Sequence, residues 1–93
     1  MRRELVVTPK FKRAFSKFVR RDKKLLKSIE MTLEQMQEDI FSSSLNTHKL
    51  SGTLEGLRAC SCGYDCRIVF SLEQSADVEV IVLLDIGKHD QVY

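Results

Sequence analysis

The 93-residue sequence contains no long apolar run. No stretch approaches the roughly 20 consecutive apolar residues that a membrane-spanning helix needs. The basic start, MRRELVVTPK, is not followed by the apolar segment of a secretory signal peptide. Internal repeats, low-complexity tracts and linkers are also lacking. We therefore expect one folded domain spanning residues 1–93, located in the cytoplasm and without membrane contact.

The sequence also lacks the short motifs of several enzyme classes. It has no glycine-rich phosphate-binding loop and no serine-nucleophile signature. Cysteine is limited to Cys60, Cys62 and Cys66 within CSCGYDC. Zinc usually requires four ligands, commonly from Cys-x2-4-Cys pairs, and His48 would have to supply the fourth. We instead expect small apolar strand residues in a reducing compartment, with no metal and no cofactor.

Positive charge is concentrated near the N terminus. Residues 1–27 hold 11 of the 15 Lys and Arg residues but only two of the 13 acidic residues, whereas the net charge of the chain is +2. This asymmetry predicts a basic surface that meets a polyanion or an acidic protein partner. A solvated helix face is the alternative.

The first half of the sequence predicts a strand followed by a helical hairpin. The segment ELVVT is rich in β-branched residues, which favour a strand. Thr8 then offers an N-cap and Pro9 occupies the first helical position. Apolar residues recur at helical spacing as far as Phe18, and Asp22 can cap a second helix that reaches Ile40.

In the second half of the sequence, apolar residues recur at the two-residue spacing of β-strands. SSSLNTHKLSG is polar and reads as a loop. Residues from Leu57 onward alternate, with Gly63 and Tyr64 as the turn before DCRIVFSLE. The run VEVIVLLDI is apolar on nearly both faces, which indicates an interior strand. The predicted class is therefore α+β: an N-terminal strand, a helical hairpin and a mainly antiparallel sheet with the helices on one face.

Polar residues that can perform RNA cleavage lie at the predicted strand ends. Antiparallel pairing brings the start of one strand beside the end of the next. We expect eight residues to converge there: His48, Lys49, Asp65, Arg67, Lys88, His89, Asp90 and Tyr93. Continued alternation past the last strand would point Asp90 outward.

Attack of a ribose 2′-hydroxyl on the adjacent phosphate needs a base that takes the hydroxyl proton and cations that stabilise the charge on the phosphate. It also needs an acid that protonates the leaving oxygen. Histidine titrates near neutral pH and can serve at either end. Arg67 and Lys49 could hold phosphate, and Tyr93 could stack on a base. Each residue also has a purely structural interpretation. His48 could be a loop histidine, Arg67 could pair with a carboxylate on the surface, and Tyr93 could cover the apolar core.

Two segments together resemble a known family. HKLSGTLEGLRACSCGYDCRIVF followed by IVLLDIGKHDQVY is similar to the RelE/ParE superfamily of type II toxin-antitoxin toxins, most closely its YafQ-like branch of mRNA interferases. The resemblance covers essentially the whole chain. It implies a RelE-like, microbial RNase-like fold and metal-free cleavage of mRNA in the ribosomal A site. It also implies a cognate antitoxin that folds onto the toxin, with DNA contacted only through their complex.

The resemblance implies a role for each matched position. The catalytic residues that the resemblance implies are His48 of the His-x-Leu-x-Gly motif, the acidic Asp65, His89 after the final strand, and the terminal aromatic Tyr93. Arg67 falls where other RelE-like toxins carry a phosphate-binding arginine. With it, Lys49 and Lys88 are the expected substrate-binding residues. Because its positive charge is dense and these groups lie elsewhere, the segment from Arg2 to Lys27 is expected to bind ribosomal RNA.

Ser61 departs from the YafQ-like pattern, which has another histidine there. Serine neither accepts a proton well near neutral pH nor carries positive charge, so Asp65 with His48 would supply the base. Two further functions stay open. One is a non-enzymatic ParE-like inhibitor of gyrase, against which His48 and His89 argue. The other is a weakened toxin that acts mainly as a corepressor with its antitoxin.

Overall fold

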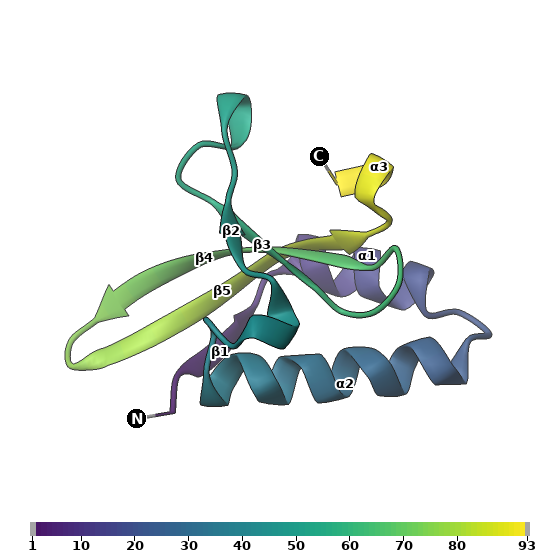
Figure 1. The fold of residues 1–93 in the computed structure, drawn as a ribbon, viewed down its shortest axis with the longest axis horizontal. Coiled ribbons are helices and arrows are strands. Elements are labelled where there is room, and N and C mark those ends of the chain that lie inside the picture. Colours follow the sequence, from purple (N-terminus) through teal and green to yellow (C-terminus); the bar gives the residue numbers. More distant parts are fainter. Residues whose placement is uncertain (1, 93) are drawn as a thin grey trace.

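Five strands form one mixed sheet in the computed structural model, which describes residues 2–92 apart from the side chain of Gln91. The strands are β1 (Glu4–Val7), β2 (His48–Lys49), β3 (Arg58–Ser61), β4 (Arg67–Ser75) and β5 (Val78–Gly87). Their order is β1-β5-β4-β3-β2 (Figure 1). β1 runs parallel to β5, and the other neighbours are antiparallel. The predicted α+β class and the interior position of the VEVIVLLDI strand are confirmed.

Two helices follow β1 and begin where the sequence predicts. The Thr8 hydroxyl accepts a hydrogen bond of 3.1 Å from the backbone N–H of Phe11, which caps α1 (Pro9–Phe18). The Asp22 carboxylate accepts one of 2.9 Å from the N–H of Leu25 and caps α2 (Lys23–Glu38) in the same way. The connection between the helices is short enough to make a hairpin (Figure 1).

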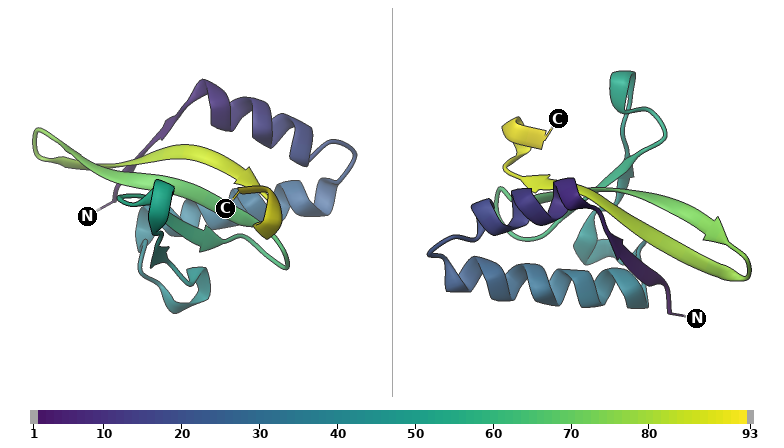
Figure 2. Two further views of the ribbon diagram at one scale, coloured as in Figure 1. Left: turned by 90° about the horizontal axis from the view of Figure 1, so that it is seen from above. Right: turned by 180° about the vertical axis from the view of Figure 1, so that it is seen from behind.

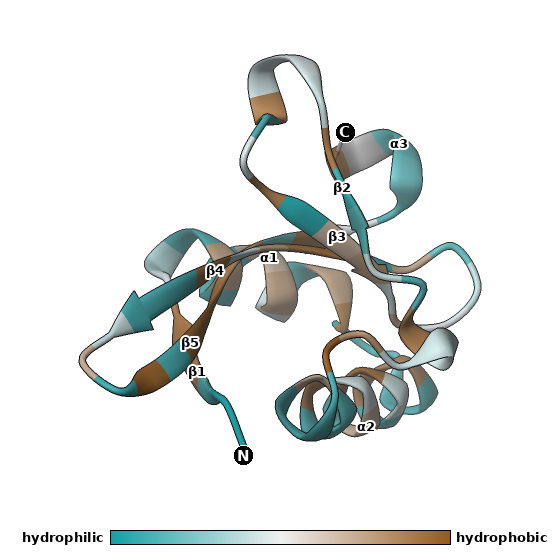
Figure 3. Cartoon of the chain, turned by 60° about the vertical axis from the view of Figure 1, so that its left-hand side comes forward, coloured by the Kyte–Doolittle hydropathy of each residue, from teal (hydrophilic) through white to brown (hydrophobic). Residues whose placement is uncertain are grey.

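Both helices and the sheet contribute to one apolar core. Its fully or nearly buried side chains come mainly from α1, α2, β4 and β5, including Phe11, Ile29, Met36, Phe70 and Leu83. α2 lies below the sheet, whereas the segment 50–57 and α3 (His89–Val92) project from the other side (Figures 1 and 2). Hydropathy colouring shows the apolar strands above α2 and the polar outer side of that helix (Figure 3).

A β-bulge changes the facing of residues near the end of β5. Val69 pairs with Asp85 while Phe70 pairs with Leu83, so Leu84 is an additional residue on β5. Residues that pair directly across strands point to the same face of a sheet. Asp85 therefore lies with Val69 on the face opposite to the core, which we call the outer face.

The segment 42–52, predicted as a loop, is more ordered than expected. It contains β2 and a short 3-10 turn, Ser43–Leu45, and a second such turn, Gly52–Leu54, begins at its last residue. β2 was missed because it has only two residues, both polar and exposed, and so shows no alternation. Its pairing with β3 creates the strand.

The prediction of three reduced cysteines is wrong, because Cys62 and Cys66 form a disulfide. Cys60 is free and buried. Burial raises the pKa of the Cys60 thiol to about 12, although the nearby charge of Arg67 acts in the opposite direction. The three side chains are buried apolar groups, as predicted, but two of them also form a cross-link.

Within residues 2–92, no helix has the length and apolar character needed to cross a lipid bilayer.

Candidate active site

Ser61, Arg67 and Gly87 form a row across three strands on the outer face. Ser61 on β3 pairs with Arg67 on β4, which pairs with Gly87 on β5. The adjacent row begins with His48, which pairs with Ala59 two residues before Ser61. Because paired residues share a face and every second residue returns to it, His48 and Arg67 lie on the same side of the sheet.

Asp65 connects this row to the C-terminal segment. It lies in the turn between β3 and β4, with φ at 52°. Its Oδ1 accepts a hydrogen bond of 3.2 Å from the backbone N–H of His89, the first residue of α3. Lys88 precedes His89 directly and, like it, is exposed. The structure therefore brings Asp65 to the backbone of His89, and Lys88 is the neighbour of His89 in the chain.

The C-terminal segment is helical rather than extended. The N–H of Val92 donates to the carbonyl of Lys88 at 3.2 Å, and His89–Val92 form one turn of helix. Strand alternation therefore does not continue past β5 as expected, although Asp90 is exposed. Successive residues of a helix are about 100° apart, because one turn takes 3.6 residues. The predicted site residue Tyr93 lies outside the described residues.

His48 is exposed at the edge of the sheet and is oriented by its neighbours. Its Nδ1 lies 3.0 Å from the carbonyl oxygen of Asn46. The Thr47 hydroxyl donates to the carbonyl of Ile40 at 2.5 Å, which holds the chain before β2. When Nδ1–H donates to Asn46, the neutral imidazole carries its basic lone pair on Nε2. This tautomer suits a general base.

Lys49 points to the other face of the sheet from His48. It pairs with Arg58, which pairs with Phe70 of the core face. Together with the segment 50–57, Lys49 and Arg58 line a pocket of about 390 Å³. The structure thus separates Lys49 from the row that contains Arg67.

Arg67 is half-buried, and its guanidinium is held against the backbone. Nη1 donates to the carbonyl of Cys66 at 2.9 Å. Among residues 2–92 no carboxylate forms an ion pair with Arg67, so the alternative of a carboxylate partner is not what the structure contains. A guanidinium at the end of the sheet that no carboxylate of the described residues neutralises is suited to an anionic ligand.

Asp85 is a polar residue of the outer face that the sequence reasoning missed. Its side chain is only 22% exposed, and its carboxylate lies 3.6 Å from the ammonium of Lys10 on α1. Oδ1 also accepts a 2.9 Å hydrogen bond from the N–H of Ile86. A single carboxylate inside the apolar run VLLDIG was the signal available in the sequence.

The turn that carries Asp65 is fixed on both sides. The Cys62–Cys66 disulfide closes it, and the Cys62 N–H donates to the Cys66 carbonyl at 3.0 Å. The hydroxyl of Ser28 on α2 donates to the Cys62 carbonyl at 2.9 Å. Two cysteines that flank a predicted hairpin turn could have indicated this cross-link, because their side chains come close across antiparallel strands.

The described residues offer acid-base groups and cations rather than a metal centre. Within residues 2–92 there is no group of three or more His, Cys, Asp or Glu side chains that could hold a metal ion. His48 and Asp65 can accept a proton, His89 can donate one, and Arg67 and Lys88 supply positive charge. These are the groups that phosphodiester cleavage by a 2′-hydroxyl requires.

The fold is shared with bacterial RelE-like toxins. A YoeB/ParE toxin from Agrobacterium tumefaciens has a TM-score of 0.76 and 16% identity, over 92% of this chain and 98% of that one. A YafQ mutant from E. coli has a TM-score of 0.72 and 18% identity, over 98% of each chain. A chain of the heterotetrameric YoeB-YefM toxin-antitoxin complex from Staphylococcus aureus has a TM-score of 0.71 and 19% identity, over 96% and 99%.

The sequence itself identifies the family. Residues 3–93 match the family described as the bacterial toxin of type II toxin-antitoxin system, YafQ. A comparison with curated proteins found no match. The chain belongs to the YafQ toxin family, as the resemblance of its two motif segments predicted.

Proposed function

We propose that this toxin is a ribosome-dependent endoribonuclease that cleaves mRNA by metal-free acid-base chemistry. The observation that supports it best is the hydrogen bond between the Asp65 carboxylate and the backbone of His89. It joins two titratable residues from separate segments, next to the strand end where Arg67 lies. Membership of the YafQ toxin family agrees with this reaction.

In the proposed reaction, His48 and Asp65 are the candidate bases for the ribose 2′-hydroxyl proton. The 2′-oxygen attacks the adjacent phosphorus while Arg67 and Lys88 stabilise the additional negative charge. His89 donates a proton to the departing 5′-oxygen, and the products are a 2′,3′-cyclic phosphate and a free 5′-hydroxyl. The 2′-oxygen–phosphorus bond forms and the bond from phosphorus to the 5′-oxygen breaks without any oxidation or reduction.

Three other positions have subsidiary roles in this proposal. Tyr93 holds the substrate base or phosphate. Ser61 faces Arg67 but supplies no base, so proton abstraction depends on His48 and Asp65. Lys49, on the other face of β2, contacts RNA away from the reacting phosphate.

We also infer that a cognate antitoxin inhibits the protein. The YoeB-YefM structure from Staphylococcus aureus is a heterotetrameric toxin-antitoxin complex, and its toxin shares this fold. In this proposal the antitoxin folds onto the toxin when it binds. Contact with DNA occurs only through the antitoxin complex.

The proposal is tested by inducing the protein in bacteria and mapping mRNA 5′ ends. We expect growth arrest and new ends at defined positions within codons. Because a general acid typically contributes 10²–10⁴-fold in rate, His89→Ala should remove nearly all of these ends. Asp90→Ala, a change at the next exposed position of α3, is the matched control and should be milder. Both variants should melt near the parental temperature, because neither side chain is buried.

The outcomes separate the candidate functions. DNA damage without mRNA ends would replace the proposal with a ParE-like action on gyrase. If the protein produces neither mRNA ends nor DNA damage, but its complex with the antitoxin represses transcription, it acts as a corepressor. Parental cleavage by His89→Ala would exclude His89 as the acid.

A further inference from the structure

Tyr64 is fully exposed at the tip of the turn between β3 and β4. Its relative exposure is 102%, compared with 64% for Met31 and 58% for Phe41, the next most exposed large apolar side chains in the described residues. An aromatic ring held entirely in water contributes no burial to the fold. Its position next to Asp65 instead suits contact with a ligand at the candidate active site.

The turn presents this ring from a rigid base. The Cys62–Cys66 disulfide closes the turn, and Ser28 on α2 donates a 2.9 Å hydrogen bond to the carbonyl of Cys62. Gly63 has φ at 125°, and a Cβ atom at this position would lie 3.2 Å from the Ser28 hydroxyl. Such pre-organisation lowers the entropic cost of binding a ligand.

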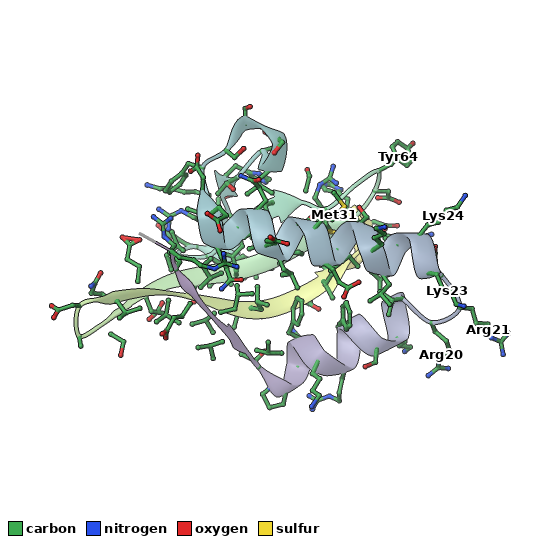
Figure 4. All side chains as sticks on the ribbon, turned by 90° about the horizontal axis from the view of Figure 1, so that it is seen from below. Arg20, Arg21, Lys23, Lys24, Met31 and Tyr64 are labelled. Carbon is green, nitrogen blue, oxygen red and sulfur yellow. A yellow bond between two sulfur atoms is a disulfide. The ribbon has the colours of Figure 1, made fainter. Side chains whose placement is uncertain are left out.

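The same end of the molecule carries dense positive charge. Arg20 and Arg21 extend from the connection between α1 and α2, and Lys23 and Lys24 extend from the start of α2; Tyr64 extends from the neighbouring turn (Figure 4). Ser28 contacts the turn that carries Tyr64, and Ser28 lies about one helical turn from Lys24 on α2. The turn is therefore close to Lys24. Among residues 2–92, none of the four labelled cations forms an ion pair. The one acid between them, Asp22, accepts the capping hydrogen bond from Leu25.

We propose that Tyr64 is a stacking platform for an unpaired nucleobase of RNA, with the phosphates of the same strand held by the cations at this end. Single-stranded RNA combines flat apolar bases with a charged backbone, and proteins bind it with aromatic rings next to Lys and Arg. An acidic peptide would satisfy the charges but would not need a fully exposed ring. This inference rests on the proposed function, because it names a substrate contact of the same site.

The position of Tyr64 in the chain places this contact beside the reacting groups. Consecutive Cα atoms are about 3.8 Å apart, so the ring projects from the residue next to Asp65. Asp65 in turn bonds to the backbone of His89. A nucleotide stacked on Tyr64 would therefore neighbour the nucleotide that is cleaved and help to fix its register.

The test is the affinity of purified protein for a fluorescent single-stranded oligoribonucleotide at low salt, measured in the His89→Ala background to prevent cleavage. Stacking of one base typically contributes 1–3 kcal/mol, so Tyr64→Ala should weaken binding roughly 5- to 150-fold. Tyr64→Phe keeps the ring and should bind like the parent. A fully paired RNA duplex should show little difference between the variants, because its bases are not available for stacking.

Phe41→Ala provides a matched control for removal of an exposed aromatic ring. Phe41 follows the opposite end of α2, and its ring lies 5.9 and 6.0 Å from the guanidinium carbons of Arg3 and Arg58. Its removal should leave RNA affinity within about twofold. Melting temperatures of the variants separate loss of contact from loss of folding.

Equal affinity of Tyr64→Ala and the parent would overturn the inference, as would no measurable RNA binding by the parent. An effect of Tyr64→Ala on antitoxin binding alone would assign the ring to a protein partner instead. Cleavage of mRNA on ribosomes by the otherwise wild-type protein is scored separately. If cleavage persists while Tyr64→Ala has no effect, only the Tyr64 inference fails; if the protein does not cleave mRNA, the proposed function fails.

Discussion

Asp65 can act in two ways at the residue scale, and two substitutions separate them. Its carboxylate accepts a hydrogen bond from the backbone of His89 and is also a candidate base. Asp65→Asn keeps an oxygen acceptor for that hydrogen bond but cannot take up a proton. Asp65→Ala removes both properties. We expect both variants to lose about 10²- to 10⁴-fold in single-turnover cleavage, with α3 still docked in the Asn variant.

Parental cleavage by Asp65→Asn, with loss only in Asp65→Ala, would contradict a role in proton transfer. Asp65 would then be a positioning residue for α3, and His48 would be the base. The chemical shift of the His89 amide, measured by NMR, reports whether the hydrogen bond survives in each variant.

The sequence predicted which segments meet better than it predicted where each side chain points. Asp65, Arg67 and His89 were expected to converge because they lie at neighbouring strand ends, and the structure brings Asp65 to His89. Lys49 was grouped with them because it precedes a predicted strand and its cation could hold phosphate. Alternation in β2 sends these two consecutive side chains to opposite faces, which depends on pairing with β3.

At the scale of elements, the disulfide-closed turn should contribute measurably to stability. A cross-link over a sequence separation of four closes a small loop, and the chain-entropy estimate for it is about 2 kcal/mol. Reduction should therefore lower the free energy of unfolding by about that amount, measured by urea denaturation with and without dithiothreitol. The Cys62→Ala/Cys66→Ala double variant is the control and should not respond to the reductant.

Alkylation with iodoacetamide checks the thiols directly. We expect no label on the native protein, one after unfolding without reductant, and three after unfolding with it. The buried Cys60 stays protonated and protected in the native state, because its pKa is raised to about 12. Three labels without reductant would contradict the disulfide.

Helices and strands with a clear hydrophobic period could be predicted from the sequence, whereas elements too short to show such a period could not. α1, α2, β4 and β5 are long enough to show helical or strand spacing, and Thr8 and Asp22 marked the helix starts. β2 and α3 have two and four residues, too few for a period. The bulge at Leu84 depends on pairing between strands, which local sequence does not specify.

At the scale of the whole molecule, the uneven charge predicts salt-dependent binding to the ribosome. Lys12, Arg13 and Lys17 on α1 line one exposed surface with Arg20, which follows the helix, whereas Lys10 is near Asp85. Each phosphate contact with single-stranded nucleic acid adds about 0.7 to the slope of log affinity against log salt. Replacing Lys12, Lys17, Arg20 and Arg21 by Gln should therefore flatten the slope measured for ribosome binding.

Arg2 and Arg3 provide the control for this charge prediction. Their guanidiniums pair with Glu38 and Glu79, so their replacement by Gln should change the salt slope little. An unchanged slope in the fourfold Gln variant would leave these cations as a solvated surface of the helical hairpin. The sequence predicted the basic segment as a whole, but only the fold separates the paired cations from the others.

The central claim is cleavage of mRNA on the ribosome, and a reconstituted reaction tests it most directly. Purified protein is mixed with mRNA that is either free or bound to ribosomes with an empty A site, and cleavage rates are measured. We expect cleavage of the ribosome-bound mRNA, little cleavage of the free mRNA, and a rate about 10²- to 10⁴-fold lower for His89→Ala. Equal cleavage of free and bound mRNA, intact mRNA in both reactions, or a parental rate for His89→Ala would contradict the account.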